Sequence, residues 1–416
     1  MNIRIDRRQL LHAAMYGLGA VALPGVAQVL QARGFTHGVA SGEPTADSVL
    51  LWTRFVTDRD TRLSVEVARD VMFGRIVARG ECTAEPDRDH TARTVVGGLE
   101  PGRWYFYRFI ASDGSMSAVG RTRTLPQGDV QRFGLGLFSC SNIGFGWFNA
   151  YAHACERTDL DLVVHVGDYL YEYAIGTYPT LKELMPGRLI QPSNEILSLA
   201  DYRLRHACYR LDPDLQRLHQ FYPMITLLGL EQEKWLRAGL QRSTSAKTRW
   251  QVLAQQVVMG EMIVPQEAKN WIGDDATETA RKELTIALAA ARAGLPFNFD
   301  CWDGFPAARR RLLEDAANAN ANLVVLAGDS HNAWANNLEN GKTAVGVEFA
   351  THSVTSPGFE SYLPRVSPDE LAAALRATNR HLAYADTRHR GYTSVMLTPQ
   401  SATALRTAQS PSVALW

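Results

Sequence analysis

Hydrophobic and polar residues follow two different patterns along the chain, and the pattern changes near residue 127. Residues 49–55, 63–68 and 104–110 are short segments rich in β-branched and aromatic residues, with glycine and proline turns between them. Such segments are typical of β-strands, and strands spaced in this way predict a small β-sandwich. Because no cluster of titratable residues falls in this part, we expect it to be structural or to shape the substrate site.

After residue 128, apolar strand-like segments alternate with segments of helical periodicity. This alternation predicts an α/β domain, in which catalytic groups usually lie at the carboxyl ends of strands. Pro306 suits the first turn of one of the helices. The predicted strands are residues 133–139, 160–166, 250–258 and 322–327, and the predicted helices are residues 147–157, 230–240, 277–293 and 306–313.

The first residues have a different composition. Arg7 and Arg8 precede a long apolar stretch without charged residues, which is the layout of a twin-arginine export signal. An ordinary N-terminal helix is the alternative. We assign residues 1–34 to the signal, residues 35–127 to the β-sandwich and residues 128–416 to the catalytic domain. The expected location is the periplasm or the exterior, reached through the twin-arginine translocation machinery.

Composition excludes several other classes of protein. Basic and acidic residues balance at 43 each, so the chain has no signature of nucleic-acid binding. After the predicted signal, no apolar run is long enough to span a bilayer. The five cysteines lack the CxxC spacing of zinc sites, and their odd number leaves at least one thiol outside any disulfide.

Three predicted strands end in residues that commonly ligate metals. Cys140 follows the first strand, Asp168 and Tyr171 follow the second, and Asp329 and His331 follow the third. Strand ends of one sheet converge, so these five side chains could face one pocket. The glycine before each aspartate should let the backbone turn tightly.

The types of these residues point to metal chemistry. Thiolate, phenolate and imidazole together suit ferric iron, and carboxylates also suit a harder cation such as calcium. A pair of metals can bind a phosphate and activate water for attack. Each residue alone has an ordinary structural explanation: a cap, a surface group or a small buried side chain. The recurrence at three strand ends favours a metal site.

Longer motifs surround these positions. They are FSCS at residues 138–141, HVGDYLYEY at 165–173, CWDGFPAARRRLL from Cys301, LAGDSHNAWANNL from Leu326, EFATHSVTSPG from Glu348 and RHRGYTSVMLTP from Arg388. Together they resemble the alkaline phosphatase D (PhoD-like) family of metallophosphoesterases. HGVASGEPTADSVLLWTR, from His37, resembles the opening of the N-terminal fibronectin-like domain of that family.

The resemblance implies a fibronectin-like β-sandwich followed by a metallophosphoesterase-type αββα sandwich domain. It implies a phosphoric ester hydrolase that contains Fe³⁺ and Ca²⁺ and acts on a phosphate ester substrate. By motif match, Cys140, Asp168 and Tyr171 would bind iron, with Asp168 shared with calcium. Asp329 and His331 would complete the metal shell, and Asp168 and His331 would be the catalytic residues.

Neighbouring residues in the same motifs have less direct expected roles. Tyr169 and Tyr173 are expected to pack rather than to ligate. His352 either lines the pocket or is structural. Trp302 and Asp303 are expected to be architectural, because the arginines that follow them resemble one solvated face of a helix.

One region departs from the family pattern. Residues 219–225 resemble the start of a family strand that normally leads into an Asp-His-Glu loop, but here they run directly into residues 226–232, which resemble a much later part of the family sequence. The catalytic domain is therefore predicted to be internally truncated, with the loss of a metal ligand, a histidine and interior strands.

Two interpretations of function follow. The chain is either a metal-dependent phosphomonoesterase or phosphodiesterase that uses a metal-activated water, or a catalytically impaired pseudoenzyme that binds phosphorylated ligands. Binding of calcium alone is less favoured, because it would give Cys140 and Tyr171 no role.

Overall fold

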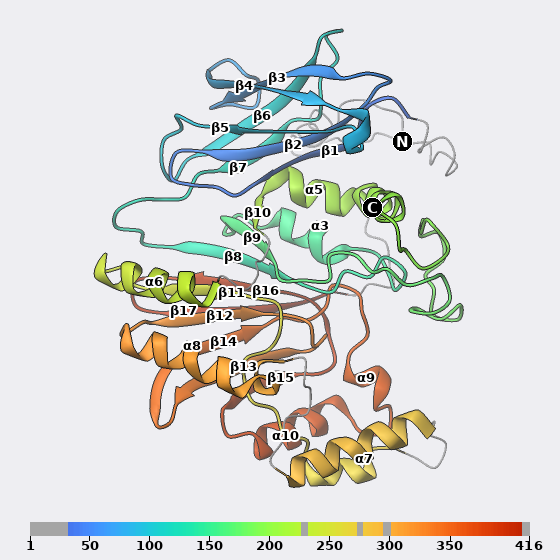
Figure 1. Ribbon diagram of the computed structural model, residues 1–416, viewed down its shortest axis with the longest axis vertical. Helices are drawn as coiled ribbons and strands as arrows, with labels where there is room; N and C mark the ends of the chain where they lie inside the picture. The colour runs from blue at the N-terminus through green and yellow to red at the C-terminus, as the bar shows by residue number, and fades with distance from the viewer. Residues whose placement is uncertain (1–31, 226–231, 273–277, 294–300, 410–416) are drawn as a thin grey trace, which may run out of the picture. The chain divides into compact units, whose positions relative to one another are not determined.

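The computed structural model describes residues 32–225, 232–272, 278–293 and 301–409. Figure 1 shows the chain coloured by residue number. The described residues form two compact units. The first contains residues 32–131, 151–163 and 172–225, and the second contains the remainder. The predicted export signal, including Arg7 and Arg8, lies outside the described residues. None of the helices in the described ranges is both long and apolar enough to cross a membrane.

The first unit contains two β-sheets around one hydrophobic core. One sheet has the order β4-β3-β6-β7, and in the other β10, β1, β2 and β5 lie side by side. The strands are β1 (Gly34–Gly42), β2 (Val49–Val56), β3 (Thr61–Ala68), β4 (Ile76–Ala84), β5 (Thr91–Val96), β6 (Trp104–Ala111), β7 (Gly120–Arg123) and β10 (Pro223–Ile225). This arrangement confirms the strands expected at residues 49–55, 63–68 and 104–110; the closer likeness to fibronectin stays a prediction.

Alternation of side chains explains why these strands form a sandwich. In β2 and β6 every second residue is buried, and Leu51, Tyr107 and Phe109 contribute to the shared core. The period of two matches the pleat of a strand with one covered face. Helices α4 (Leu199–Arg210) and α5 (Pro213–Phe221) also belong to this unit, and α4 begins with a capping box between Ser198 and Asp201.

The second unit contains a five-stranded sheet of order β11-β12-β14-β13-β15. Its strands are β11 (Gln251–Ala254), β12 (Leu323–Ala327), β13 (Ala333–Asn340), β14 (Thr343–Ala350) and β15 (Leu382–Asp386). β11, β12 and β14 are parallel, whereas β13 runs antiparallel to β14 and β15. Every residue of β12 is buried, as expected for a central strand covered on both faces.

Helices cover one face of this sheet. α6 (Gln232–Ser245) and α8 (Pro306–Asn318) lie beside the sheet in Figure 1. Leu240, Leu312 and Leu313 of these helices pack in one core with residues of the sheet. Trp235, also in α6, is 57% exposed. α7 (Glu278–Arg292), α9 (Phe359–Tyr362) and α10 (Pro368–Thr378) also belong to this unit.

A smaller sheet in the second unit joins β8 (Phe133–Phe138) to β16 (Arg390–Leu397) and β17 (Ala402–Gln409). It is linked to the five-stranded sheet by hydrogen bonds, including Thr351 Oγ1 to the carbonyl of Leu137 at 3.2 Å. The helix α3 (Asn149–Glu156) and the strand β9 (Leu162–His165) are divided between the two units. Two adjoining sheets with helices on one outer face agree with the coarse α/β prediction, and the full αββα arrangement stays a prediction.

The region of the predicted truncation is described only in part. Residues 219–221 close helix α5, and only Pro223–Ile225 form a strand, β10, which pairs with β1 in parallel. The strand expected over residues 219–225 is therefore shorter than predicted. The junction at residues 226–231 lies outside the described residues.

Candidate metal centre

The ends of β8 and β9 are joined by backbone hydrogen bonds. The amide of Cys140 donates to the carbonyl of Gly167 at 3.2 Å, and the amide of Ser141 donates to the carbonyl of Asp168 at 2.9 Å. These two bonds fix the loop after β8 against the loop after β9. Cys140 and Asp168 therefore come from different strands but share one rigid backbone frame.

The residues with candidate ligand side chains have an unusual backbone conformation. φ is +54° at Cys140, +51° at Asp168, +67° at Asp329 and +61° at His331. Residues other than glycine rarely adopt positive φ, because the Cβ atom crowds the backbone. Such strain persists where the surrounding structure imposes it, and it is concentrated at functional sites. Positive φ is thus found at four of the five residues that the sequence predicts as metal ligands.

The two glycines before the aspartates have different roles, which corrects the expectation that both permit a tight turn. Gly167 has φ of +120°, so a side chain there would be strained. No positive φ occurs at Gly328; instead, a Cβ atom there would lie 2.5 Å from the Cβ atom of Ser139. Gly328 is required for close packing between the ends of β12 and β8.

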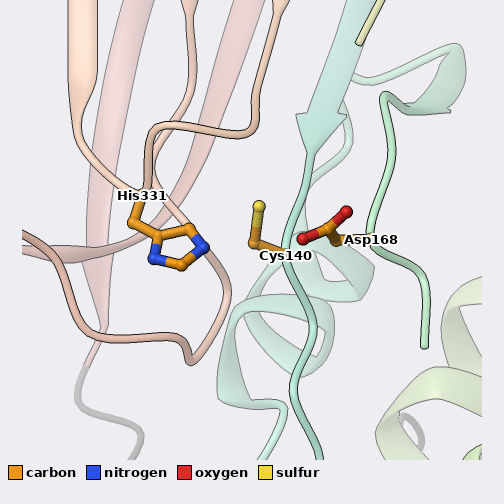
Figure 2. Close-up of side chains that lie close together, drawn as sticks. All are labelled: Cys140, Asp168 and His331. Carbon is orange, nitrogen blue, oxygen red and sulfur yellow. The ribbon is translucent and has the colours of Figure 1, made fainter. Parts of the chain in front are cut away.

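Three of the predicted ligands come together. One ligand atom from each of Cys140, Asp168 and His331 lies within 4.8 Å of the other two, and Figure 2 shows these side chains gathered where the loops meet. Cys140 is fully buried, whereas Asp168 and His331 are partly exposed. A thiol, a carboxylate and an imidazole at this spacing can bind one metal ion and leave a side open to solvent.

The hydrogen bond on the far side of the His331 ring fixes its tautomer. Nδ1 of His331 lies 2.7 Å from the carbonyl oxygen of Pro357. A carbonyl oxygen only accepts, so Nδ1 carries the proton and Nε2 of the neutral ring has a free lone pair. Burial lowers the pKa of His331 and favours this neutral form. This is the usual arrangement of a metal-binding histidine.

Tyr171 lies beside the same imidazole. Its hydroxyl oxygen is 3.5 Å from Nε2 of His331 and accepts a 3.0 Å hydrogen bond from Ser356. The phenol side chain is buried. Tyr171 is therefore placed as a fourth donor beside the three clustered side chains. Tyr169, in contrast, packs edge-on against His165 with ring centroids 5.3 Å apart, as expected of a packing residue.

The electrostatics of the site depend on a cation. Burial is the main cause that raises the pKa of both Cys140 and Tyr171, and the neighbouring Asp168 charge raises both further. Without a cation both groups stay protonated at neutral pH. A metal ion reverses this preference, because it stabilises thiolate and phenolate directly. The donor set of sulfur, phenol oxygen, carboxylate and imidazole fits a ferric ion.

Asp329 lies outside the group of three clustered ligand atoms, and its place in the metal shell stays a prediction. Its backbone carbonyl accepts a weak contact of 3.8 Å from the thiol of Cys140. Asp329 also lines a neighbouring cavity of about 200 Å³ together with Cys301, Asp303 and Trp334. The charge of the Asp329 carboxylate also helps to raise the pKa of Cys140, so this side chain lies near the cluster.

Other residues of the motifs have structural contacts. His352 is fully buried, and its Nε2 atom lies 3.1 Å from Oδ2 of Asp386. Trp302 donates from Nε1 to Gln255 at 2.9 Å, and Asp303 accepts from the amide of Met262 at 3.1 Å. These contacts agree with architectural roles for Trp302 and Asp303. All five cysteines are free thiols, and four of them are buried.

Sequence reasoning missed two contributors to the site, Ser356 and Pro357. Both lie in the loop after β14, and both belong to the EFATHSVTSPG motif that begins at Glu348. Nothing in their residue types indicates a site, because serine and proline are ordinary loop residues. Their role depends on which group the loop faces, and only the fold shows that.

Comparisons with known proteins agree with this organisation. A family profile described as PhoD-like phosphatase matches residues 135–227 and 223–405, and a profile described as the PhoD-like phosphatase N-terminal domain matches residues 21–126. Alkaline phosphatase D of Bacillus subtilis (strain 168) is 28% identical, over 96% of this chain and 83% of that protein. The solved structure described as PhoD matches with a TM-score of 0.72 and 25% identity, over 90% of both chains.

The family match is divided where the sequence suggested a missing segment. The two matched parts of the phosphatase profile meet at residues 223–227. The alignment with the Bacillus protein extends over 525 positions, although this chain has 416 residues, so it contains long gaps in this chain. The N-terminal profile begins at residue 21, within the predicted export signal.

Proposed function

The chain belongs to the PhoD-like phosphatase family, and we propose that it hydrolyses phosphoric esters at the site formed by Cys140, Asp168 and His331. The observation that supports this most directly is the approach of their three ligand atoms to within 4.8 Å. Membership of the family supports phosphoester hydrolysis as the reaction class.

In this proposal Cys140, Asp168 and Tyr171 hold Fe³⁺, and Asp168 also faces Ca²⁺. Bound metal ions offset the negative charge of the phosphate and acidify a water molecule for attack. Asp168 contributes charge and fixed geometry through its place on the strained loop after β9. His331 supplies its Nε2 lone pair, which the hydrogen bond from Nδ1 to Pro357 keeps available.

The substrate class is a phosphomonoester or a phosphodiester, because a site built on metal ligands can bind either. The expected location, the periplasm or the exterior, rests on the twin-arginine pattern at Arg7 and Arg8.

A pseudoenzyme is the second candidate, and the divided family match favours it. If the segment with the Asp-His-Glu loop is deleted at residues 223–227, the site lacks a ligand and a nearby histidine. Losing a ligand or its support typically costs about 10- to 100-fold in metal affinity or activity. Such a chain would bind phosphorylated ligands without turning them over.

One experiment separates the two candidates. Iron and calcium are measured by elemental analysis in freshly purified protein, and hydrolysis of p-nitrophenyl phosphate and bis-p-nitrophenyl phosphate is measured on the same sample. Near-stoichiometric metal, with turnover lost in Asp168→Asn, supports the hydrolase. Bound metal without turnover supports the pseudoenzyme, and absence of both metal and turnover refutes the proposed active site.

A further inference from the structure

Beyond the direct ligands, the loop that orients His331 is held by an ion pair. Arg390, the first residue of β16, pairs through its guanidinium with the carboxylate of Glu360 in α9. The Arg390 side chain is 7% exposed and the Glu360 side chain is 27% exposed. A pair this well buried is shielded from solvent and salt, unlike a pair on the surface.

Arg390 connects two loops at once. One of its guanidinium nitrogens donates to the carbonyl of His331 at 3.3 Å, while the other contacts Glu360. The guanidinium fork suits this double role, because its donors diverge in fixed directions. Arg390 thereby joins the backbone of His331 to the loop that follows Pro357.

The loop after Pro357 is held tightly by Glu360 and Asn332. Glu360 accepts from the amide of Gly358 at 3.1 Å, and Asn332 accepts from the amide of Phe359 at 3.2 Å. A Cβ atom on Gly358 would lie 2.6 Å from Oδ1 of Asn332 and 3.0 Å from a guanidinium nitrogen of Arg390. The absence of a side chain at Gly358 is what allows this close approach.

We propose that Arg390 and Glu360 are positioning residues that hold the carbonyl of Pro357 against Nδ1 of His331. The pair acts through that carbonyl and touches none of the clustered ligand atoms itself. With the carbonyl in place, the proton stays on Nδ1 and Nε2 keeps its lone pair directed to the metal site. The inference rests on the proposed site for the role of His331, but its first test needs neither metal nor turnover.

The test measures the His331 tautomer directly in metal-free, ¹⁵N-histidine-labelled protein. Two-dimensional ¹H–¹⁵N spectra distinguish a ring protonated at Nδ1 from one protonated at Nε2, and His331→Gln identifies the signal. In the unaltered protein we expect the Nδ1–H form. In Arg390→Gln and Glu360→Gln we expect a substantial Nε2–H fraction, because the Pro357 carbonyl is no longer held.

The second readout is metal affinity, with Co²⁺ as the probe because its visible spectrum reports thiolate and imidazole ligation. We expect binding to weaken about 10- to 100-fold in each variant, as is typical when a group that orients a ligand is lost. The double variant should lose no more than the stronger single one, because both act through the same carbonyl. Arg390→Lys should restore little, since one ammonium cannot reach both acceptors.

Arg388→Gln is the matched control. Arg388 lies two residues away and pairs with Asp369 at 2.9 Å, but this pair is exposed, so the tautomer and the Co²⁺ affinity should not change. If Arg390→Gln fails to fold, the nearly isosteric variant Glu360→Gln is used to test the proposal by the same two measurements. A folded variant with an unaltered tautomer and unaltered Co²⁺ affinity overturns the proposal. If the tautomer responds but the parent protein hydrolyses no ester, the positioning role stands and the proposed function fails.

Discussion

Ser356 donates a 3.0 Å hydrogen bond to the phenolic oxygen of Tyr171. The hydroxyl of Ser356 also lies 3.3 Å from the carbonyl oxygen of Cys140, so one serine contacts two residues of the candidate metal centre. When Tyr171 is deprotonated by a bound cation, this hydrogen bond would stabilise the phenolate, since charge-assisted hydrogen bonds are stronger than neutral ones. Ser356 is therefore placed to stabilise the phenolate form of Tyr171.

This contact predicts a change of colour. If Tyr171 is a phenolate on ferric iron, the iron-loaded protein absorbs visible light, and Tyr171→Phe removes that band. Ser356→Ala keeps the band but shifts it to longer wavelength, because the phenolate loses the hydrogen bond that lowers the energy of its electrons. Visible absorption spectra of the three iron-loaded proteins check this.

Tyr169→Phe is the control for that series. Tyr169 belongs to the same sequence motif, but its ring packs on His165, so its removal should leave the band unaltered. A band that survives in Tyr171→Phe, or that disappears in Tyr169→Phe, would show that Tyr171 is not the phenolate ligand.

Strand positions were accessible from the sequence because alternation and apolar runs depend only on local burial. Leu323–Ala327 and Phe133–Phe138 were predicted almost to the residue, and Pro306 was correctly placed at the start of a helix. The meeting of Cys140 with Asp168 also followed from the rule that ligands collect at strand ends.

Other features of the site depend on long-range geometry and could not be read from residue types. Asp329 and His331 share one motif, yet the turn after β12 sends only His331 into the cluster. The orientation of that imidazole depends on Pro357, which is 26 residues away along the chain. Periodicity along the sequence carries no information about which loop faces which.

Because Asp329 lies outside the three-residue cluster, we predict that its substitution weakens metal binding less than substitution of Asp168 does. Asp168→Asn should remove most metal binding, because Asp168 belongs to the cluster of three. Asp329→Asn should cost less than tenfold in affinity, because Asp329 is not one of the three clustered ligands. Co²⁺ titration of both variants measures the difference. Equal losses of Co²⁺ affinity would show that Asp329 is a direct metal ligand.

Gly328→Ala should destabilise the protein and weaken metal binding. The new Cβ atom would lie 2.5 Å from the Cβ atom of Ser139 and 2.9 Å from a methyl group of Val166. Overpacking of this kind typically costs about 1–3 kcal/mol of unfolding free energy. The end of β12 must move away from the ends of β8 and β9 to make room, so the spacing between His331 and Cys140 should change as well.

The control for that prediction is Gly239→Ala in helix α6. A Cβ atom there meets only the far end of Arg242 at 4.0 Å, so alanine should stabilise the helix by about 0.5–1 kcal/mol. Urea denaturation measures both changes. If both alanine variants change the unfolding free energy in the same direction, the close packing around Gly328 does not explain the effect of Gly328→Ala.

Stability should fall in mild acid, because several buried histidines are held neutral. Burial lowers the pKa of His165 to about 3. Burial together with nearby arginines lowers the pKa of His37 to about 3 and that of His206 to about 4. An unfolded histidine has a pKa of about 6.5. Between these values the unfolded chain binds more protons than the folded chain, so stability is full above about pH 6.5 and is lost as the pH falls toward 4.

Asp214 opposes this trend. Burial raises its pKa to about 7, so the folded chain holds a proton there that an unfolded aspartate releases above about pH 4. Its contribution to stability is therefore full below pH 4 and lost as the pH rises to 7. Among these four groups, three histidines against one carboxyl leave about two extra protons bound on unfolding between pH 6 and 4, so these groups contribute a loss of about 2–3 kcal/mol per pH unit.

Urea denaturation of chelator-treated protein at several values between pH 7.5 and 4.5 checks the sign and the slope. His37→Gln should reduce the slope by about 1.4 kcal/mol per pH unit, because it removes one of the protons taken up on unfolding. The exposed His389 supplies the control, and His389→Gln should leave most of the slope in place. Stability that is constant or rises on acidification would mean that His37, His165 and His206 are not held neutral by burial.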